Sequence, residues 1–283
     1  MIDRLKVLPQ YLIPKQAITL LAGKIASAKA GKLTTTMIAW FVNRYHVNMS
    51  EAAQPNIEAY ESFNEFFTRP LKKGVRRINK ADFISPVDGA ISQFGTIKSD
   101  QIFQAKGHHY STLAILAGNR TLAENFQNGS FATLYLSPKD YHRIHMPCDG
   151  QLKSMTYVPG DLFSVNPTTA QGIPGLFARN ERLVCEFQSS HGVFVLILVG
   201  ATIVGSMATI WHGTINNPRL GKIKTWDFSD QHLSLKQGEE MGRFLLGSTV
   251  VMLFPEKKLS FNRTWKAAKP VRLGEKMASF IPS

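Results

Sequence analysis

The sequence predicts an α+β protein in which N-terminal amphipathic helices precede a mostly antiparallel β sandwich or barrel with duplicated β-units. Three observations support this fold class: helical spacing of apolar residues up to about residue 68, short apolar runs broken by glycine and proline from Ile84 onward, and repeated turn motifs. A chain of 283 residues that is 44% hydrophobic can form one large core or two smaller ones. We therefore divide it into a helical segment at 1–68 and a β-rich domain at 69–283.

The N-terminal segment has the composition and spacing of short helices. Residues 17–30 are rich in alanine, leucine and lysine, which favour helix. Residues 35–45 place apolar side chains near helical spacing, namely Met37, Ile38, Trp40, Phe41 and Tyr45. A further short helix containing Phe66 and Phe67 is expected to begin at Asn64, because asparagine is a good N-cap residue.

The remainder of the chain reads as short strands. Apolar or alternating runs that predict strands are Phe131–Leu136, Leu183–Phe187, Val193–Val199 and Thr249–Phe254. The uncharged run Val193–Trp211 is long enough for a membrane-spanning helix. Its valine, isoleucine and threonine content, interrupted by Gly200 and Gly205, instead favours two buried strands joined near Gly200.

Two turn motifs occur twice. Residues 86–91, PVDGAI, resemble residues 147–152, PCDGQL. Residues 236–241, KQGEEM, followed by Phe244, resemble residues 272–277, RLGEKM, followed by Phe280. Each copy places glycine beside an acidic residue between apolar runs, as expected for turns between strands. The repetition predicts a duplicated β-unit.

The chain is strongly basic, with 33 lysine and arginine residues against 20 acidic ones and a net charge of +13. Such a surface attracts nucleic acid, anionic lipid or acidic substrates. We find no zinc finger, RNP-like motif or glycine-rich phosphate loop, so no nucleic-acid partner is predicted. Before Asn48 the chain has a single acidic residue, Asp3, and seven basic ones. The basic residues are Arg4, Lys6, Lys15, Lys24, Lys29, Lys32 and Arg44. This bias predicts either helices lying on an anionic membrane or a helical cap with a solvated basic face.

Three short stretches contain candidate functional residues. His142 and His145 lie three residues apart in a polar stretch flanked by proline, which favours catalysis over a structural role. A metal could use this pair, but no convincing third ligand is nearby, so no metal is predicted. Gly247-Ser248 before a valine-rich run is by itself typical of a turn, and Asp88 alone reads as a turn acid before Gly89.

Taken together, these stretches closely resemble the phosphatidylserine decarboxylases, specifically the long bacterial, pyruvoyl-dependent type. The resemblance rests on SPVDG at 85–89, YHRIHMP at 141–147 and LGST at 246–249. Further matching segments follow the family's order along the chain and are FNEFFTR at 63–69, YVPGDLFSVN at 157–166 and VGA at 199–201.

The resemblance implies a role for each candidate residue. Ser248 would be the nucleophile of self-cleavage between Gly247 and Ser248, and afterwards the covalent pyruvoyl group. Asp88 and His145 would complete a charge-relay triad with it. His142 would lie near the substrate carboxylate and assist decarboxylation or reprotonation.

The chemistry of these residue types is consistent with such roles. A serine hydroxyl needs a base to become nucleophilic, and a carboxylate can orient the imidazole that acts as that base. Attack on the Gly247 carbonyl gives an ester. Its β-elimination, followed by hydrolysis with loss of ammonia, would leave a β chain of residues 1–247 and an α chain, 248–283, that begins with a ketone. That ketone would form a Schiff base with the substrate amine and accept the electrons released as CO₂ leaves, without a metal or diffusible cofactor.

The resemblance also implies partners and a location. The substrate would be phosphatidylserine, the product phosphatidylethanolamine, and residues 1–68 a membrane-associating segment on an anionic surface. No signal peptide is recognisable before Pro14. We therefore expect peripheral attachment to the cytoplasmic side of a bacterial inner membrane. Family resemblance also suggests a homodimer of cleaved protomers.

Two other functions stay open at this point. A serine hydrolase could use Asp88, His145 and Ser248 on an external ester or peptide, and its chain would remain intact. A non-enzymatic lipid-binding or carrier module could account for the β-repeats and the basic face, and it would not depend on Ser248.

Overall fold

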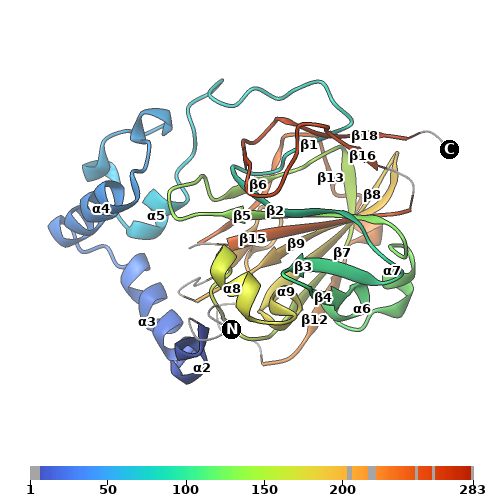
Figure 1. Cartoon of the computed structure of the whole chain (residues 1–283). Helices are drawn as coiled ribbons and strands as arrows, with labels where there is room; N and C mark the ends of the chain where they lie inside the picture. Colours follow the sequence, from blue (N-terminus) through green and yellow to red (C-terminus); the bar gives the residue numbers. More distant parts are fainter. Residues whose placement is uncertain (1–6, 203–205, 216–220, 246–247, 257–258, 282–283) are drawn as a thin grey trace.

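Helices precede antiparallel sheets along the chain, as the sequence predicts (Figure 1). The computed structural model describes residues 7–202, 206–215, 221–245, 248–256 and 259–281. The N-terminal helices are α2 (Pro9–Leu12), α3 (Lys15–Ser27), α4 (Lys32–Tyr45), η1 (Met49–Glu51), η2 (Ile57–Ala59) and α5 (Phe63–Phe67). Shorter helices among the strands are α6 (Thr112–Ile115), α7 (Arg120–Glu124), α8 (Pro167–Gly172), α9 (Leu176–Arg179) and η3 (Ser229–Gln231).

The N-terminal helices have a small core of their own. Ile38 and Phe41 of α4 pack against Phe63, Phe66 and Phe67 of α5. The cap expected at Asn64 is wrong, because the N-cap of α5 is Ser62, whose Oγ accepts the Glu65 N–H at 3.2 Å. The Glu65 carboxylate also reaches back to the Glu61 N–H at 2.8 Å, which fixes the earlier start. Because α5 begins after Ser62, its aromatic side chains Phe63, Phe66 and Phe67 are all buried in this small core.

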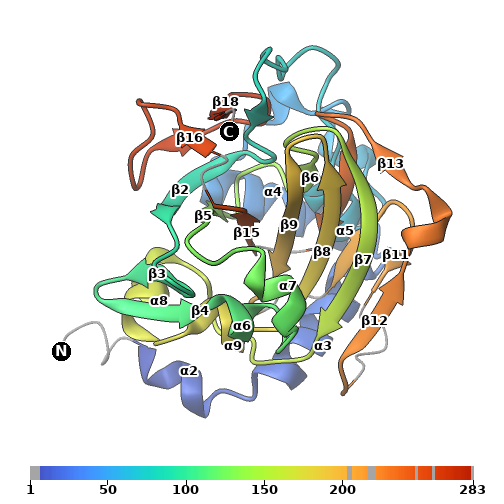
Figure 2. The same ribbon diagram turned by 90° about the vertical axis from the view of Figure 1, so that its right-hand side faces the viewer.

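Half of the described strands belong to one nine-stranded sheet. Its order is β12 (Lys224–Asp227), β7 (Gly150–Val158), β8 (Arg182–Ser189), β9 (Gly192–Val199), β15 (Ser248–Phe254), β5 (Ser130–Leu136), β2 (Gly89–Thr96) and β17 (Pro270–Val271), and β13 (Ser234–Leu235) also pairs with β7. Figure 2 shows the curvature of β7, β8 and β9 across this sheet. All its ladders are antiparallel, which confirms the expected pairing.

Three smaller sheets complete the β-rich part. The first contains β11 (Gly213–Thr214), β10 (Met207–Thr209), β14 (Glu240–Phe244) and β6 (Arg143–His145). The second contains β1 (Phe83–Ile84), β18 (Lys276–Phe280) and β16 (Leu259–Phe261), and the third pairs β3 (Gln101–Ala105) with β4 (His108–Ser111).

The long uncharged run divides into two strands, as predicted. It contributes β9 and β10, and its residues 203–205 lie outside the described part of the chain. Among the described residues, no helix has both the length and the apolar character needed to cross a membrane.

The strand β15 is the centre of the large sheet. It is hydrogen-bonded on one edge to β5 and on the other to β9, and all of its residues are buried. Burial on both faces explains why its sequence is a continuous apolar run rather than an alternating one. Its first residue is Ser248, which pairs with Leu136 at the end of β5.

The repeated motifs form equivalent turns. The N–H groups of Gly274 and Gly238 donate to the carbonyls of Ser85 and Met146 at 3.0 and 2.9 Å. Both glycines have a positive φ, +86° and +82°, which explains why glycine occupies both positions. Each motif aspartate accepts a backbone N–H at 2.8 Å, Asp88 from Leu273 and Asp149 from Gln237. The predicted duplication therefore appears as two turns that have the same arrangement of hydrogen bonds.

Candidate active site

Ser248 is buried at the start of β15. Its residue surface is 1% exposed, and its Oγ has no hydrogen-bond partner among the residues that the structure describes. Because buried hydroxyl groups are nearly always hydrogen-bonded, this unpaired atom marks a functional candidate. Gly247, the other residue of the expected cleavage site, lies outside the described residues.

His142 lies close to the same strand end. Its Nε2 donates to the Ser137 carbonyl at 3.1 Å, one residue beyond the Leu136 that pairs with Ser248. Since the carbonyl can only accept, the proton is on Nε2 and Nδ1 carries a lone pair. That Nδ1 is buried and has no partner within the described ranges. His142 therefore offers an uncommitted basic nitrogen near Ser248.

The environment of His142 keeps its imidazole neutral. Complete burial and, second, the charge of Arg69 lower the pKa of His142 to about 3. The ring stacks on Phe67, with 4.1 Å between ring centroids and 23° between planes. Phe67 belongs to α5, so the N-terminal helical part supplies one wall of the His142 pocket.

His145 is held by two hydrogen bonds. Its Nδ1 donates to the Gly238 carbonyl at 2.8 Å, and its Nε2 lies 3.1 Å from the Tyr141 hydroxyl. Burial raises the pKa of Tyr141, so the phenol stays protonated and donates to Nε2. Burial also lowers the pKa of His145. Both histidines are thus neutral imidazoles with a defined tautomer.

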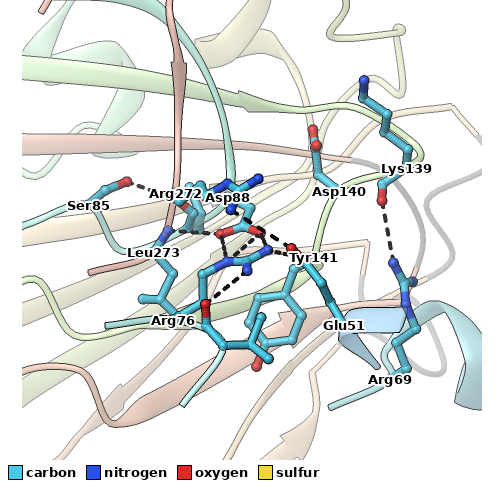
Figure 3. Close-up of polar contacts among 12 residues, drawn as sticks. Glu51, Arg69, Arg76, Ser85, Asp88, Lys139, Asp140, Tyr141, Arg272 and Leu273 are labelled. Atoms are coloured by element: carbon cyan, nitrogen blue, oxygen red, sulfur yellow. Dashed lines mark hydrogen bonds and ion pairs between the residues drawn. The ribbon is translucent and has the colours of Figure 1, made fainter. Parts of the chain in front are cut away.

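Asp88 is held by an arginine rather than by a histidine (Figure 3). The Arg76 guanidinium donates to both carboxylate oxygens of Asp88, with Nε 3.0 Å from each, and its Nη2 also lies 2.6 Å from Glu51. Leu273 N–H supplies a further bond at 2.8 Å. In the described part of the chain, Asp88, His145 and Ser248 are therefore not joined by hydrogen bonds. The His145 N–H nevertheless donates to the Pro86 carbonyl at 2.9 Å, so His145 and Asp88 lie on adjacent segments.

A polar cleft lies beside these residues. It has a volume of about 290 Å³, and its walls come from the ends of α4, η1, the loop after β5 and the turn at β17. Its charged lining residues are Glu51, Arg69, Arg76, Asp88, Lys139, Asp140 and Arg272. A neighbouring and more apolar cleft of about 480 Å³ shares Gly89, Lys139, Asp140 and Pro270 with it. Segments far apart in the sequence thus enclose a space suited to a charged, partly apolar ligand.

A buried serine near the neutral imidazole of His142, with His145 and Asp88 on adjacent segments of a mostly antiparallel β scaffold beside a polar cleft, defines an enzyme site of the serine–histidine type. The sequence profile described as phosphatidylserine decarboxylase matches residues 63–279, and a second profile, described as PSD, matches residues 5–46. The chain belongs to the phosphatidylserine decarboxylase family.

Similar bacterial proteins match over nearly the whole chain, and all three described here are named phosphatidylserine decarboxylase proenzyme. The protein of Dechloromonas aromatica is 70% identical over 279 residues, 99% of each chain. That of an Azoarcus species is 66% identical over 281 residues, 99% of this chain and 98% of the relative. That of Methylobacillus flagellatus is 66% identical over 270 residues, 95% of this chain and 96% of the relative.

Several residues of the site were not identified from the sequence. Arg76 and Glu51 carry no local signal, because an arginine and a glutamate in polar stretches usually face solvent. Tyr141 stands inside the histidine motif, but nothing in the sequence indicates that it donates to His145. Arg69 is the last residue of the FNEFFTR segment, and this position was a sequence hint that it belongs to the site.

The neutral state of His142 predicts an acid-dependent loss of stability. The folded-state pKa lies below the unfolded value, so between pH 6.5 and about 3 the unfolded chain binds a proton that the folded chain does not. The free energy of unfolding should fall by about 1.4 kcal/mol per pH unit from this group as the pH decreases through that window. Urea unfolding of Ser248→Ala and Ser248→Ala/His142→Gln proteins between pH 7 and 4 measures the contribution. Equal pH slopes for the two proteins would contradict it.

Proposed function

We infer that this chain is a self-processing phosphatidylserine decarboxylase that cuts itself between Gly247 and Ser248 and carries a pyruvoyl group derived from Ser248. The observation that carries this proposal is the buried Oγ of Ser248, which has no partner among the described residues and lies near the neutral imidazole of His142, in a chain of this family. A buried hydroxyl without a partner costs about 1–3 kcal/mol, which a reactive role explains.

Burial of Ser248 favours attack on its own chain over attack on an external ester. The residue is 1% exposed, so a separate substrate has no access to Oγ in this structure. The carbonyl of the preceding residue, in contrast, is part of the same peptide and needs no binding step. The serine-hydrolase alternative therefore requires an opening of the site that self-cleavage does not.

We assign the self-cleavage base to His145, oriented by Asp88. Its unprotonated Nε2 would have to release the Tyr141 hydroxyl before taking the Ser248 proton. Asp88 would have to exchange part of its contact with Arg76 for one with the imidazole. As Oγ bonds to the Gly247 carbonyl carbon, the Gly247–Ser248 C–N bond breaks, giving the ester whose elimination separates the two chains.

The surroundings of Ser248 also fit the pyruvoyl group that would replace it. Its buried Oγ marks a position that the described residues leave without a competing hydrogen bond. Such a group supplies a carbonyl that accepts electrons while CO₂ leaves the amine substrate. The lone pair on Nδ1 of His142 would first accept a proton, and the imidazole would then deliver that proton to the substrate carbon that CO₂ leaves. Phe67 and the burial of His142 exclude water from this proton transfer.

We further propose that the N-terminal helices attach the enzyme to the cytoplasmic side of a bacterial inner membrane. Helices α2 to α4 expose large apolar side chains, including Leu12 at 88%, Leu33 at 75%, Leu21 at 60% and Trp40 at 59%. Lysines 15, 24, 29 and 32 and Arg44 lie on the same helices or their connections, whereas Arg4 and Lys6 are outside the described residues. Apolar and basic side chains together favour an anionic bilayer surface. A homodimer of cleaved protomers is part of this proposal.

Self-cleavage should be visible in the mass of the denatured protein. The wild-type chain should give a C-terminal fragment of residues 248–283, about 4 kDa of the 31.6 kDa total, whose amino end is blocked to Edman sequencing. Ser248→Ala should remain one chain. An active protein that stays intact, with an unmodified Ser248, would instead support the hydrolase.

The two histidines should differ in their effect on maturation. His145→Ala and Asp88→Asn should slow appearance of the fragment by about three orders of magnitude, because each removes a member of the proposed relay. His142→Ala should still cut but should lose decarboxylation. Time-resolved mass spectrometry and CO₂ release measure the two steps. Normal cutting by His145→Ala, with none by His142→Ala, would move the base to His142.

Membrane attachment should depend on the exposed apolar side chains rather than on the fold of the helices. Deleting the N-terminal segment would remove Ile38 and Phe41 from the small core, so substitutions are the cleaner test. Leu21→Gln/Leu33→Gln/Trp40→Gln should weaken binding to phosphatidylglycerol-containing vesicles about 10-fold or more. Ile281→Gln is the control, because that side chain is also exposed and directly follows β18, which lies across the molecule from α4 in Figure 1. Unchanged vesicle binding by the triple variant would refute this role.

A further inference from the structure

Arg69 is a buried cation without a carboxylate partner. The residue is 3% exposed, and within the described ranges it forms no ion pair. Its nearest acceptors are the carbonyls of Phe66 and Lys139, at the long distances of 3.5 and 3.4 Å from Nη1 and Nη2. Its Nε is buried and has no acceptor at all among the described atoms. An uncompensated buried charge is strongly unfavourable, so the protein gains if an anion completes the site.

The other charges in the polar cleft do not neutralise Arg69. The carboxylates of Glu51 and Asp88 are both engaged by Arg76. Asp140 instead accepts the N–H and the hydroxyl of Ser137, each at 2.7 Å, and burial raises its pKa. Every acid that lines this cleft thus has a partner other than Arg69, as Figure 3 shows for the pairing of Arg76.

The position of Arg69 links the cleft to the reacting serine. Arg69 bonds the Lys139 carbonyl, in the loop that continues β5 beyond Leu136, and Leu136 is the residue opposite Ser248. The charge of Arg69 also reaches His142, whose pKa it helps to lower. An anion bound at Arg69 would therefore lie beside the loop that flanks the reaction site.

We propose that Arg69 binds the phosphodiester of the lipid substrate, and that the polar cleft beside it is the headgroup subsite. This inference rests on the proposed decarboxylase function and extends it to substrate recognition. A guanidinium offers several donors in a planar fork that suits phosphate oxygens. Arg272, whose side chain is 64% exposed and forms a long ion pair with Glu51 at 3.8 Å, adds positive charge at the cleft rim.

The substrate carboxylate is a poorer occupant of this position. A guanidinium bound to that carboxylate would stabilise the charge that must disappear as CO₂ leaves, and so would oppose the reaction. The phosphodiester keeps its charge from substrate to product. Its binding energy therefore holds the headgroup in place without raising the barrier, and one CH₂–O link separates it from the reacting carbon.

Binding to the matured wild-type enzyme tests the subsite without any substitution. Glycerophosphoethanolamine, which carries a phosphodiester, should bind at least about 10-fold more tightly than ethanolamine in calorimetry. It should also compete with dihexanoyl phosphatidylserine supplied as monomers, so that membrane attachment has no influence. Equal affinity for the two ligands would overturn the proposal. If the wild-type enzyme released no CO₂, the proposed function would fail, while calorimetry would still decide the subsite.

Two substitutions then assign the effect to Arg69. Arg69→Gln should raise KM for the soluble lipid about 10- to 100-fold with kcat changed less than about 3-fold, and Arg69→Lys should recover part of the loss. Arg120→Gln is the matched control, since Arg120 is exposed on α7 and should leave KM unchanged. A fall in kcat at constant KM would overturn the proposal, because Arg69 would then act through His142. If inorganic phosphate binding weakened in Arg69→Gln while KM did not change, the site would hold free phosphate rather than the lipid.

Discussion

The pairing of β15 between β5 and β9 is the constraint on which the rest of the structure depends. Seven residues of β15 pair with β5 and five with β9, and the strand is buried on both faces. The proposed break before Ser248, with loss of the Ser248 nitrogen, leaves the pairing of residues 249–254 with β5 and of residues 249–253 with β9 unaffected. The same C-terminal fragment also contains β17 and β18, which pair with β2 and β1. Strand pairing can thus retain the fragment after self-cleavage, because its contacts are distributed over several strands of the other chain.

The site combines a rigid scaffold with polar groups that the scaffold leaves unsatisfied. Four buried side-chain atoms without partners among the described residues lie on β15, on the loop after β5 or just after α5, namely Oγ of Ser248, Oγ1 of Thr249, Nδ1 of His142 and Nε of Arg69. Folded proteins satisfy nearly all such groups, so each of these four atoms is a candidate for a role in chemistry or in ligand binding. Elsewhere the same fold satisfies a buried cation fully, as Arg182 shows by donating to four backbone carbonyls.

The duplicated β-unit shows how one turn acquired two environments. Asp88 and Asp149 accept equivalent backbone bonds, yet Asp149 is exposed and pairs with Lys236 at the surface. Asp88 is buried by the N-terminal part of the chain, where Glu51 and Arg76 enclose it. The helical segment therefore contributes to the reaction site through Glu51 and through Phe67, in addition to its exposed apolar face.

The sequence alone determined the order of helices and strands, the division of the uncharged run into two strands, the repeated turns and the family. These features depend on local spacing and composition, which a linear pattern contains. It could name Ser248 and Asp88 only through their resemblance to family motifs, since each of these residues by itself was compatible with an ordinary turn. The spacing of His142 and His145 in a polar stretch by itself favoured catalysis. Tertiary structure alone decided which atoms of these residues are buried, bonded or free. It placed Arg76 on Asp88 and Arg69 beside the Lys139 carbonyl with no acid partner among the described residues, because these contacts join segments that only the folding of the sheets and helices brings together. It also set the local geometry in which Tyr141 donates to His145.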